Sequence, residues 1–241
     1  MITIHNVCFS YSGAPATLQD ISLSIPAGSI VVLAGANGSG KTTLLSLLAG
    51  LLSPQSGSIT RGPITTPGDE KAFRRSAGLL LQDADLQILG STVEEDLLLG
   101  GTGPQRRAAA HAMAQRFDVL QQWQTPVQHL SWGQKRKLCL AATLLREPEF
   151  LLLDEPLSGL DYPGMREMRK LIEDSKEAGL TQIITSHDLA PLVDLADIIA
   201  VMHCGRLVRA GRPEEVLDGI AEYGVRPPDC WTMDRTLRRW E

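Results

Sequence analysis

The segment GANGSGKTT, residues 35–43, constrains the fold of this chain more than any other feature. It follows the apolar run SIVVLA and precedes the apolar run LLSLLAGLL, so a glycine-rich loop joins an expected buried strand to an expected helix. In that context the pattern G-x-x-x-x-G-K-[ST] predicts a phosphate-binding loop, because glycines let backbone N–H groups approach phosphate oxygens and the helix N-terminus attracts anions. The alternative, a glycine-rich turn with a chance lysine, would not need the flanking strand and helix.

Two side chains of this loop have individual roles in the prediction. Lys41 is expected to reach the β- and γ-phosphates of a nucleotide, and the hydroxyl of Thr42 is expected to bind Mg²⁺. The other loop residues are expected to meet the phosphates mainly through their backbone N–H groups. The full set predicted to bind the nucleotide here is Gly35, Ala36, Asn37, Gly38, Ser39, Gly40, Lys41, Thr42 and Thr43.

The run FLLLDEP places Asp154 and Glu155 at the carboxyl end of an expected buried strand. Ligands of open α/β sheets collect at that edge, and two adjacent carboxylates favour a cation nearby. Asp154 is therefore predicted to hold Mg²⁺, and Glu155 to polarise an attacking water, since phosphoryl transfer depends mainly on such positioning. The alternative, a strand that ends in solvated acids before Pro156, would be preferred if the phosphate-binding loop were absent.

The order of apolar patterns predicts an α/β fold interrupted by helices. Strands are expected in the first 35 residues, and a further strand in SAGLLLQ after a stretch rich in glycine, proline and threonine at 57–68. After the helical part, strands and helices alternate again, with a helix at 163–178 and a short helix after TQIITS.

Residues 86–147 are predicted to be helical, with two capping boxes. The first is an S-x-x-E box at Ser91 and Glu94, and the second is an S-x-x-Q box at Ser131 and Gln134. In such a box the serine and the side chain three residues later satisfy backbone N–H groups at the start of a helix. The second box therefore predicts a helix that begins directly after Ser131.

Composition excludes several classes of protein. The 241 residues carry a net charge of −5, which argues against a general nucleic-acid binder, because such proteins neutralise phosphates with Lys and Arg. The basic cluster RTLRRW near the C-terminus is expected to be a solvated tail. Four scattered cysteines indicate neither a zinc site nor a disulfide framework. The N-terminus alternates like a strand, and the longest apolar run is too short for a bilayer, so a soluble chain is expected.

Taken in order, the motifs resemble those of the nucleotide-binding subunit of ABC transporters over nearly the whole chain. The matching positions are Tyr11 for stacking on adenine, the phosphate-binding loop, Gln82 as the Q-loop, the signature LSWGQ with Ser131, Trp132, Gly133 and Gln134, the acidic pair Asp154 and Glu155, Asp161 in the D-loop SGLD, and His187 as the switch histidine. The roles that the resemblance implies are catalysis by Lys41, Glu155 and His187, ATP binding also by Tyr11 and Gln82, and Mg²⁺ ligation by Thr42, Gln82 and Asp154. In the family the switch imidazole contacts the γ-phosphate.

The resemblance also implies a fold class and a division of the chain. The fold class is α/β, an ABC-type P-loop NTPase core of RecA-like form with an N-terminal antiparallel β subdomain and an inserted helical signature subdomain. A single ABC nucleotide-binding domain, residues 1–241, is expected. Within it, 1–85 and 148–225 would form the ATP-binding core, 86–147 the helical subdomain and 226–241 a C-terminal tail.

Trp132 departs from the family's signature, which usually reads LSGGQ and binds the γ-phosphate of the nucleotide held by the other subunit. A backbone N–H can face a phosphate while its side chain points away, so the family's role tolerates a tryptophan whose rotamer points outward. Two interpretations stay open. Trp132 packs on its own helical region or across the dimer without consequence, or it weakens one composite site and marks a slow subunit.

The segment LLLQDADLQILGSTVEEDLLLG resembles the energy-coupling factor and cobalt-type ATPases within the family, whose segment reads roughly FQNPDDQLF, a spacer and TVEED. The matches are Gln82, Asp85, Gln87, Ile88 and residues 92–96. The departures are Ala84 in place of a proline, Ile88-Leu89 in place of a Leu-Phe pair, and Trp132.

That resemblance implies the ATP-hydrolysing subunit of an importer for a vitamin or a transition-metal ion such as cobalt or nickel, with the substrate selected by another polypeptide. It implies a head-to-tail homodimer, or a heterodimer with a second ABC ATPase, that closes on two ATP molecules with Mg²⁺. A membrane scaffold subunit would dock near Gln82–Leu89 and hold the chain at the cytoplasmic face of the cell membrane. The run LQIL would form the docking groove, or alternatively belong to the core of the helical region.

Other members of the family remain as alternatives. The chain could be the ATPase of another ABC transporter class, or a cytosolic assembly factor, which would carry the same motifs. The DNA-repair type has a coiled-coil insertion for which the segment between Lys41 and Ser131 leaves no room, and the translation type has two cassettes where one is present. A subunit that binds nucleotide without hydrolysing it would not need Lys41, Asp154, Glu155 and His187 together.

Overall fold

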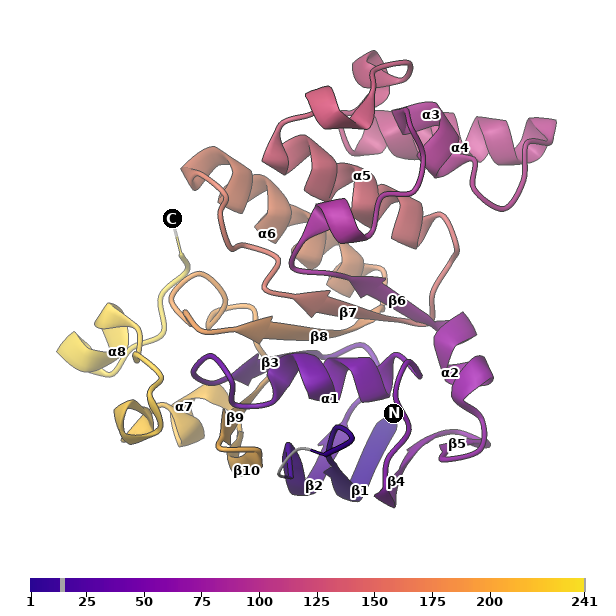
Figure 1. The fold of residues 1–241 in the computed structure, drawn as a ribbon. Helices are drawn as coiled ribbons and strands as arrows, with labels where there is room; N and C mark the ends of the chain where they lie inside the picture. Colours follow the sequence, from indigo (N-terminus) through magenta and orange to yellow (C-terminus); the bar gives the residue numbers. More distant parts are fainter. Residues whose placement is uncertain (14–15, 241) are drawn as a thin grey trace.

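Two β-sheets organise the protein, whose computed structural model describes residues 1–13 and 16–240 (Figure 1). Within this described part, one sheet has the strand order β2-β1-β4-β5 and the other the order β10-β9-β3-β8-β7-β6. The strands are β1 (Ile2–Phe9), β2 (Leu18–Ile25), β3 (Ile30–Ala34), β4 (Ser56–Arg61), β5 (Ile64–Thr66), β6 (Ala77–Leu80), β7 (Phe150–Asp154), β8 (Thr181–Ser186), β9 (Ile198–His203) and β10 (Arg206–Gly211). The α-helices are α1 (Lys41–Leu48), α2 (Glu70–Ser76), α3 (Val93–Leu97), α4 (Pro104–Arg116), α5 (Trp132–Leu144), α6 (Tyr162–Glu177), α7 (Pro213–Val216) and α8 (Asp229–Asp234).

The larger sheet is the centre of the fold because its inner strands are apolar on both faces. Every residue of β3 is buried. Ile30 and Val32 belong to one hydrophobic cluster. Val31 and Leu33 point the other way and belong to a second cluster, as the two-residue period of a strand requires. Strands β3, β6, β7, β8 and β9 run parallel and β10 pairs antiparallel with β9, so the continuous apolar runs form the parallel, doubly covered strands that were predicted.

Helix α1 lies between the central sheet and the antiparallel sheet (Figure 1). Leu44 and Leu48 of this helix share a hydrophobic cluster with Ile4 of β1 and Ile59 of β4. The helix that follows the phosphate-binding loop is therefore held from both sides. This arrangement confirms the predicted fold class, an α/β core with an N-terminal antiparallel β part.

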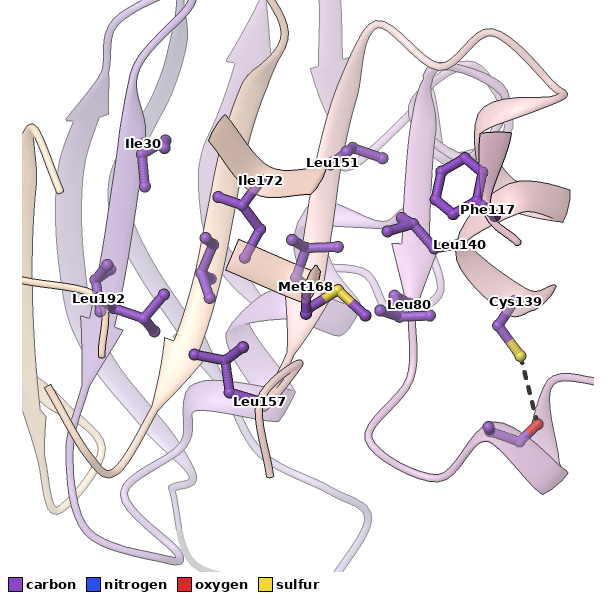
Figure 2. Packing of buried hydrophobic residues seen from close by; sticks show 14 of the residues in the cluster. Ile30, Leu80, Phe117, Cys139, Leu140, Leu151, Leu157, Met168, Ile172 and Leu192 are labelled. Carbon is purple, nitrogen blue, oxygen red and sulfur yellow. Dashed lines mark hydrogen bonds between the residues drawn. The ribbon is translucent and has the colours of Figure 1, made fainter. Parts of the chain in front are cut away.

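The opposite face of the central sheet is covered by helices that include the segment between β6 and β7. Figure 2 shows Leu140 of α5 and Met168 of α6 packed toward the sheet residues Leu80 and Leu151. Cys139 is part of this core: its Sγ lies 3.7 Å from the carbonyl oxygen of Ala84, and burial raises the pKa of the thiol to about 12. None of the helices in the described ranges is both long and apolar enough to cross a membrane.

The capping box predicted at Ser91 and Glu94 is wrong by one residue. Thr92 caps α3, and its side chain accepts a hydrogen bond from the backbone N–H of Glu95 at 3.2 Å. The carboxylate of Glu95 accepts the N–H of Ser91 at 2.9 Å. The helix starts at Val93 because this side chain is fully buried in the core, which fixes the register of the cap.

Residues 57–68, to which the sequence assigned no element, lie largely in β4 and β5, because β4 pairs with β1 and such pairing overrides a weak local pattern. One further local expectation was wrong. The segment after β8 forms turns in place of the expected short helix. Pro191 lies in this segment and has no backbone N–H to donate.

The arginines of the C-terminal cluster are exposed, as expected of a solvated tail, but Trp240 at its end packs near α6. The backbone N–H of Trp240 donates to the carboxylate of Asp194 at 3.2 Å. The ring of Trp240 lies 5.4 Å from the ring of Tyr162, and the guanidinium of Arg169 lies 5.3 Å from its centroid. The tail therefore differs from the expectation only at its apolar ring, since the indole buries surface that the arginines do not.

A substitution of Phe117, which follows α4, would test whether the helical segment shares one core with the sheet. Its ring is 2% exposed within the main hydrophobic cluster, so Phe117→Ala should lower the free energy of unfolding by about 3–5 kcal/mol. The measurement is urea unfolding followed by circular dichroism. Met233→Ala, at a side chain that is 83% exposed, should leave the midpoint unchanged. Equal midpoints for the two variants would contradict the shared core.

Candidate nucleotide-binding and hydrolysis site

The order of the central sheet brings four strand ends to one edge. β3, β8, β7 and β6 are neighbours and run parallel, so their carboxyl ends lie side by side. These ends lead, in that order, to the phosphate-binding loop, to His187, to the acidic pair and to Gln82. A cavity of about 570 Å³ at this edge is lined by Thr17, Asn37, Gly38, Ser39, Gly40, Lys41, Thr42, Thr43, Gln82, Glu155, Ser158 and His187.

The phosphate-binding loop turns sharply into α1. Gly40, the N-cap of this helix, has a φ of 102°, which side-chain-bearing residues rarely adopt. Lys41 is buried, and its ammonium donates to the carbonyl oxygens of Gly35 at 2.7 Å and of Ala36 at 3.2 Å. Burial lowers the pKa of Lys41, and the charges of the two nearby carboxylates oppose that shift. The lysine therefore sits as a partly desolvated cation inside the loop that is predicted to hold phosphates.

Thr42 and Asp154 meet as the predicted magnesium ligands would. The hydroxyl of Thr42 donates to Oδ2 of Asp154 at 3.0 Å, and the carboxylate of Asp154 is buried. Hydroxyl and carboxylate oxygens are hard ligands, and Mg²⁺ in phosphate sites commonly takes only one or two protein ligands beside phosphate and water. This donor set fits Mg²⁺. Gln82, the third predicted ligand, is exposed on the cavity wall.

Glu155 lies one residue beyond β7 with its carboxylate between two basic groups. Its Oε2 lies 2.8 Å from Nδ1 of His187, and its Oε1 lies 3.8 Å from Nζ of Lys41. The side chain is buried, and its backbone φ of 48° is unusual for a residue other than glycine. The structure therefore brings together the three residues predicted to be catalytic.

Several predicted residues do not line the cavity: Gly35, Ala36 and Asp154 lie just behind its wall, and Tyr11 and Asp161 lie elsewhere in the chain. Tyr11 packs its ring edge-on against Phe9 at 5.0 Å, and its hydroxyl lies 3.4 Å from the hydroxyl of Thr43, beside the phosphate-binding loop. Its ring keeps an exposed surface on which a base could stack. Asp161 caps α6, accepting the backbone N–H of Gly164 at 3.0 Å.

The signature residues form the start of α5 and do not line the cavity. The predicted capping box is present: the hydroxyl of Ser131 accepts the N–H of Gln134 at 3.2 Å, and the amide oxygen of Gln134 accepts the N–H of Ser131 at 2.9 Å. The box leaves the remaining N–H groups of the first helical turn unpaired within the helix, including that of Gly133. An anion could bind this helix end, but the phosphate-binding loop of the same chain lies elsewhere.

Trp132 packs on its own chain. The guanidinium of Arg136 lies 5.4 Å from the centre of the indole, and a Cβ placed on Gly159 of the D-loop would be 3.2 Å from the indole nitrogen. The side chain is still 37% exposed. The indole is thus directed toward Arg136 and the D-loop, which favours the interpretation in which it packs on its own region.

Arg136 is a structural link that the sequence analysis did not identify. Its guanidinium is buried and donates to the carbonyl oxygen of Glu155 at 2.8 Å and to that of Gln82 at 2.9 Å. One side chain of α5 therefore fixes the signature helix to two strand ends of the site. A basic residue one turn after the capping serine and ahead of the apolar run LCLA was the available signal.

A groove of about 500 Å³ lies beside the segment predicted to dock a partner. Leu86 is 73% and Leu89 is 79% exposed, whereas Ile88 packs against the main hydrophobic cluster. Ile88 therefore belongs to the core, as one interpretation of LQIL expected, and docking through the exposed Leu86 and Leu89 stays a prediction. The groove is lined by Ala49, Leu51, Arg74, Ala77, Leu79, Leu81, Gln87, Leu89, Asp96, Leu99, Arg106, Cys139, Ala142, Thr143 and Arg146.

Comparisons with known proteins agree on one family. The sequence model of the family described as "ABC transporter" matches residues 18–158. The Cobalt import ATP-binding protein CbiO of Rhodobacter capsulatus is 36% identical, covering 91% of this chain and 82% of that protein. The Energy-coupling factor transporter ATP-binding protein EcfA3 of Oenococcus oeni is 34% identical, covering 99% of this chain and 89% of that protein. The solved structure of cbiO1 from Clostridium perfringens, part of the cbiONQ transporter complex, matches with a TM-score of 0.80 at 31% identity, covering 93% of this chain and 94% of that chain.

The contacts of Trp132 lead to a prediction about the rate of ATP hydrolysis. Because the indole rests on Arg136 and the D-loop of its own chain, Trp132→Gly should change the rate by less than about tenfold, which is 1.4 kcal/mol in the barrier. Trp132→Phe, which keeps an aromatic face near the guanidinium, is the matched control. Phosphate release at saturating ATP is the measurement. A rise of about tenfold or more in Trp132→Gly would show that the tryptophan weakens the site.

Proposed function

Because the chain belongs to the ABC transporter family and is an ATPase, we propose that it is the ATP-hydrolysing subunit of an importer of the energy-coupling factor type. The likeness to cobalt import and energy-coupling factor ATP-binding proteins supports this subgroup. The observation that carries the proposal is the position of Glu155, whose carboxylate lies between Lys41 and His187 at the edge of the cavity. The transported substrate is proposed to be a vitamin or a transition-metal ion such as cobalt or nickel.

In the proposed reaction Glu155 polarises the water that attacks the γ-phosphate. His187 orients the carboxylate through the contact of 2.8 Å and meets the γ-phosphate with its other face, while Lys41 balances negative charge on the phosphates. Thr42 and Asp154 would hold Mg²⁺, which would supply positive charge to neutralise the negative charge of the phosphates. Phosphoryl transfer depends on positions and charges of this kind more than on covalent chemistry by the protein.

The proposed active form is a head-to-tail dimer. The signature at the start of α5 has free helix N–H groups but does not line its own chain's cavity, so it would bind the nucleotide held by a second cassette. This chain carries both a phosphate-binding loop and a signature, so two copies suffice to complete two sites. A second ABC ATPase could take the place of one copy. Closure on ATP and opening after hydrolysis would supply the movement.

The proposed docking site for the membrane scaffold is the groove beside Leu89. Its lining is largely apolar, and the exposed side chains of Leu51, Leu89 and Leu99 border it. Exposed apolar surface of this kind is typical of sites that bind another protein. Arg136 fixes the backbone at Gln82, where this segment begins, to the backbone of Glu155, so movement at the groove would reach the hydrolysis site directly. Docking would place the chain at the cytoplasmic face of the membrane.

Removal of the catalytic carboxylate should trap the closed dimer. Glu155→Gln keeps the size of the side chain but cannot accept a proton from water, so ATP should bind without being hydrolysed. With saturating ATP and Mg²⁺, this variant should sediment as a dimer in analytical ultracentrifugation. The double variant with Lys41→Ala, which should not bind ATP, should stay monomeric. A monomeric Glu155→Gln under saturating ATP would contradict the dimer mechanism.

Charge in the groove should abolish membrane association. Leu89→Arg places a cation on a side chain that is 79% exposed, so folding and ATP binding should persist while membrane partners are lost. The measurement is affinity purification from detergent-solubilised native membranes, with mass spectrometry of the polytopic proteins recovered. Met233→Arg, at an equally exposed side chain on α8, is the control. Unchanged recovery of a membrane scaffold with Leu89→Arg would place the docking surface elsewhere.

A further inference from the structure

Thr185 lies at the centre of the acidic edge, in the segment TSHD that carries His187, and the sequence alone assigned it no role of its own. It is the fifth residue of β8, two positions before His187, and it is fully buried. The parallel register pairs it with Asp154 of β7 on one side and with Leu33 of β3 on the other. A polar side chain at such a position needs hydrogen-bond partners, because a buried hydroxyl without them is destabilising.

Both partners of the Thr185 hydroxyl belong to the acidic pair. The hydroxyl donates its proton to Oδ1 of Asp154 at 2.6 Å and accepts the backbone N–H of Glu155 at 2.9 Å. A hydroxyl has one proton and two lone pairs, so these two bonds fix its direction. Valine has nearly the same shape as threonine but could form neither bond. The hydroxyl, and not the volume of the side chain, therefore joins the two carboxylate residues.

The backbone of Glu155 gives this bond a specific consequence. Its φ of 48° lies in the left-handed region, where residues other than glycine are strained. Such strain persists only where the surroundings hold the residue in place, and it gathers at functional sites. The N–H of Glu155 donates to Thr185, and its carbonyl oxygen accepts hydrogen bonds from Arg136 and, at 3.1 Å, from the N–H of Ser158.

We propose that Thr185 is a positioning residue for ATP hydrolysis, which holds the backbone of Glu155 in its left-handed conformation while orienting the carboxylate of Asp154. His187, two residues along the same strand end, holds the carboxylate of Glu155. The end of β8 thus contacts Glu155 at two atoms: Thr185 accepts its backbone N–H, and His187 lies next to its Oε2. This role rests on the proposed part of Glu155 in hydrolysis and adds a buried residue that does not line the cavity.

Loss of the hydroxyl should act on turnover more than on binding. Without it, Oδ1 of Asp154 and the N–H of Glu155 each lose a buried hydrogen bond, so both groups would turn toward other partners. The phosphate-binding loop has no hydrogen bond to Thr185 and would keep its shape. Small displacements of a positioning group can reduce a rate strongly, because the reaction needs the attacking water in line.

Three substitutions test the proposal. Thr185→Val should lower kcat for ATP by at least about tenfold while KM stays within about threefold, and Thr185→Ser should keep kcat within about threefold of the unchanged chain. Thr185→Ala lacks the hydroxyl and the γ-methyl group, and its kcat should fall as that of the valine variant does. The Kd for a fluorescent ATP analogue and the Tm of thermal unfolding are measured for each variant. Neither quantity should differ by more than a small amount between the valine and the serine variants.

The outcomes separate this proposal from the function on which it rests. A Thr185→Val chain with unchanged kcat, or serine and valine variants that lose kcat equally, would overturn the positioning role. A parallel loss of nucleotide binding and kcat would also overturn it, since that result indicates a structural role only. Glu155→Gln is measured alongside: hydrolysis that survives in this variant would contradict the proposed function itself. An inactive Glu155→Gln beside an active Thr185→Val would contradict the positioning role alone.

Discussion

Two adjacent carboxylates, those of Asp154 and Glu155, are buried at the end of one strand, and the site is organised around stabilising them. Burying neighbouring negative charges is unfavourable unless hydrogen bonds and opposite charge compensate. The groups that do so are the hydroxyls of Thr42 and Thr185, the ammonium of Lys41 and the imidazole of His187. These groups come from the helix after β3 and from the end of β8. The sheet order β3-β8-β7 therefore places them next to the two carboxylates, which lie at the end of β7.

Sequence patterns predicted the parts of this site whose partners lie within a few residues. The phosphate-binding loop and the capping box of Ser131 and Gln134 are local, and both formed as expected. Thr185 and Arg136 could not be assigned in this way, because their partners lie on other strands and depend on a register that one sequence does not display. The same reason explains β4, which exists because β1 pairs with it.

In the proposed function, the signature helix is the element that connects hydrolysis to other proteins. Arg136 joins it to the backbone of Glu155 and to that of Gln82, at the start of the segment that leads to the groove. Trp132 covers this arginine from outside and touches the D-loop near Gly159. In the proposed function, a change in the nucleotide site would be transmitted through these packed, hydrogen-bonded groups, and the helix N-terminus beyond Ser131 would bind a second nucleotide.

The central claim is that the signature of one copy completes the ATP site of another. Two versions of the chain, with native cysteines replaced and Glu155→Gln present, would carry one cysteine each: Asn37→Cys within the phosphate-binding loop, or His129→Cys before the signature. Mixed and treated with a short bifunctional thiol reagent, they should form a crosslinked dimer only when ATP and Mg²⁺ are present. A yield that does not respond to saturating ATP, or no crosslink at all, would contradict the composite site.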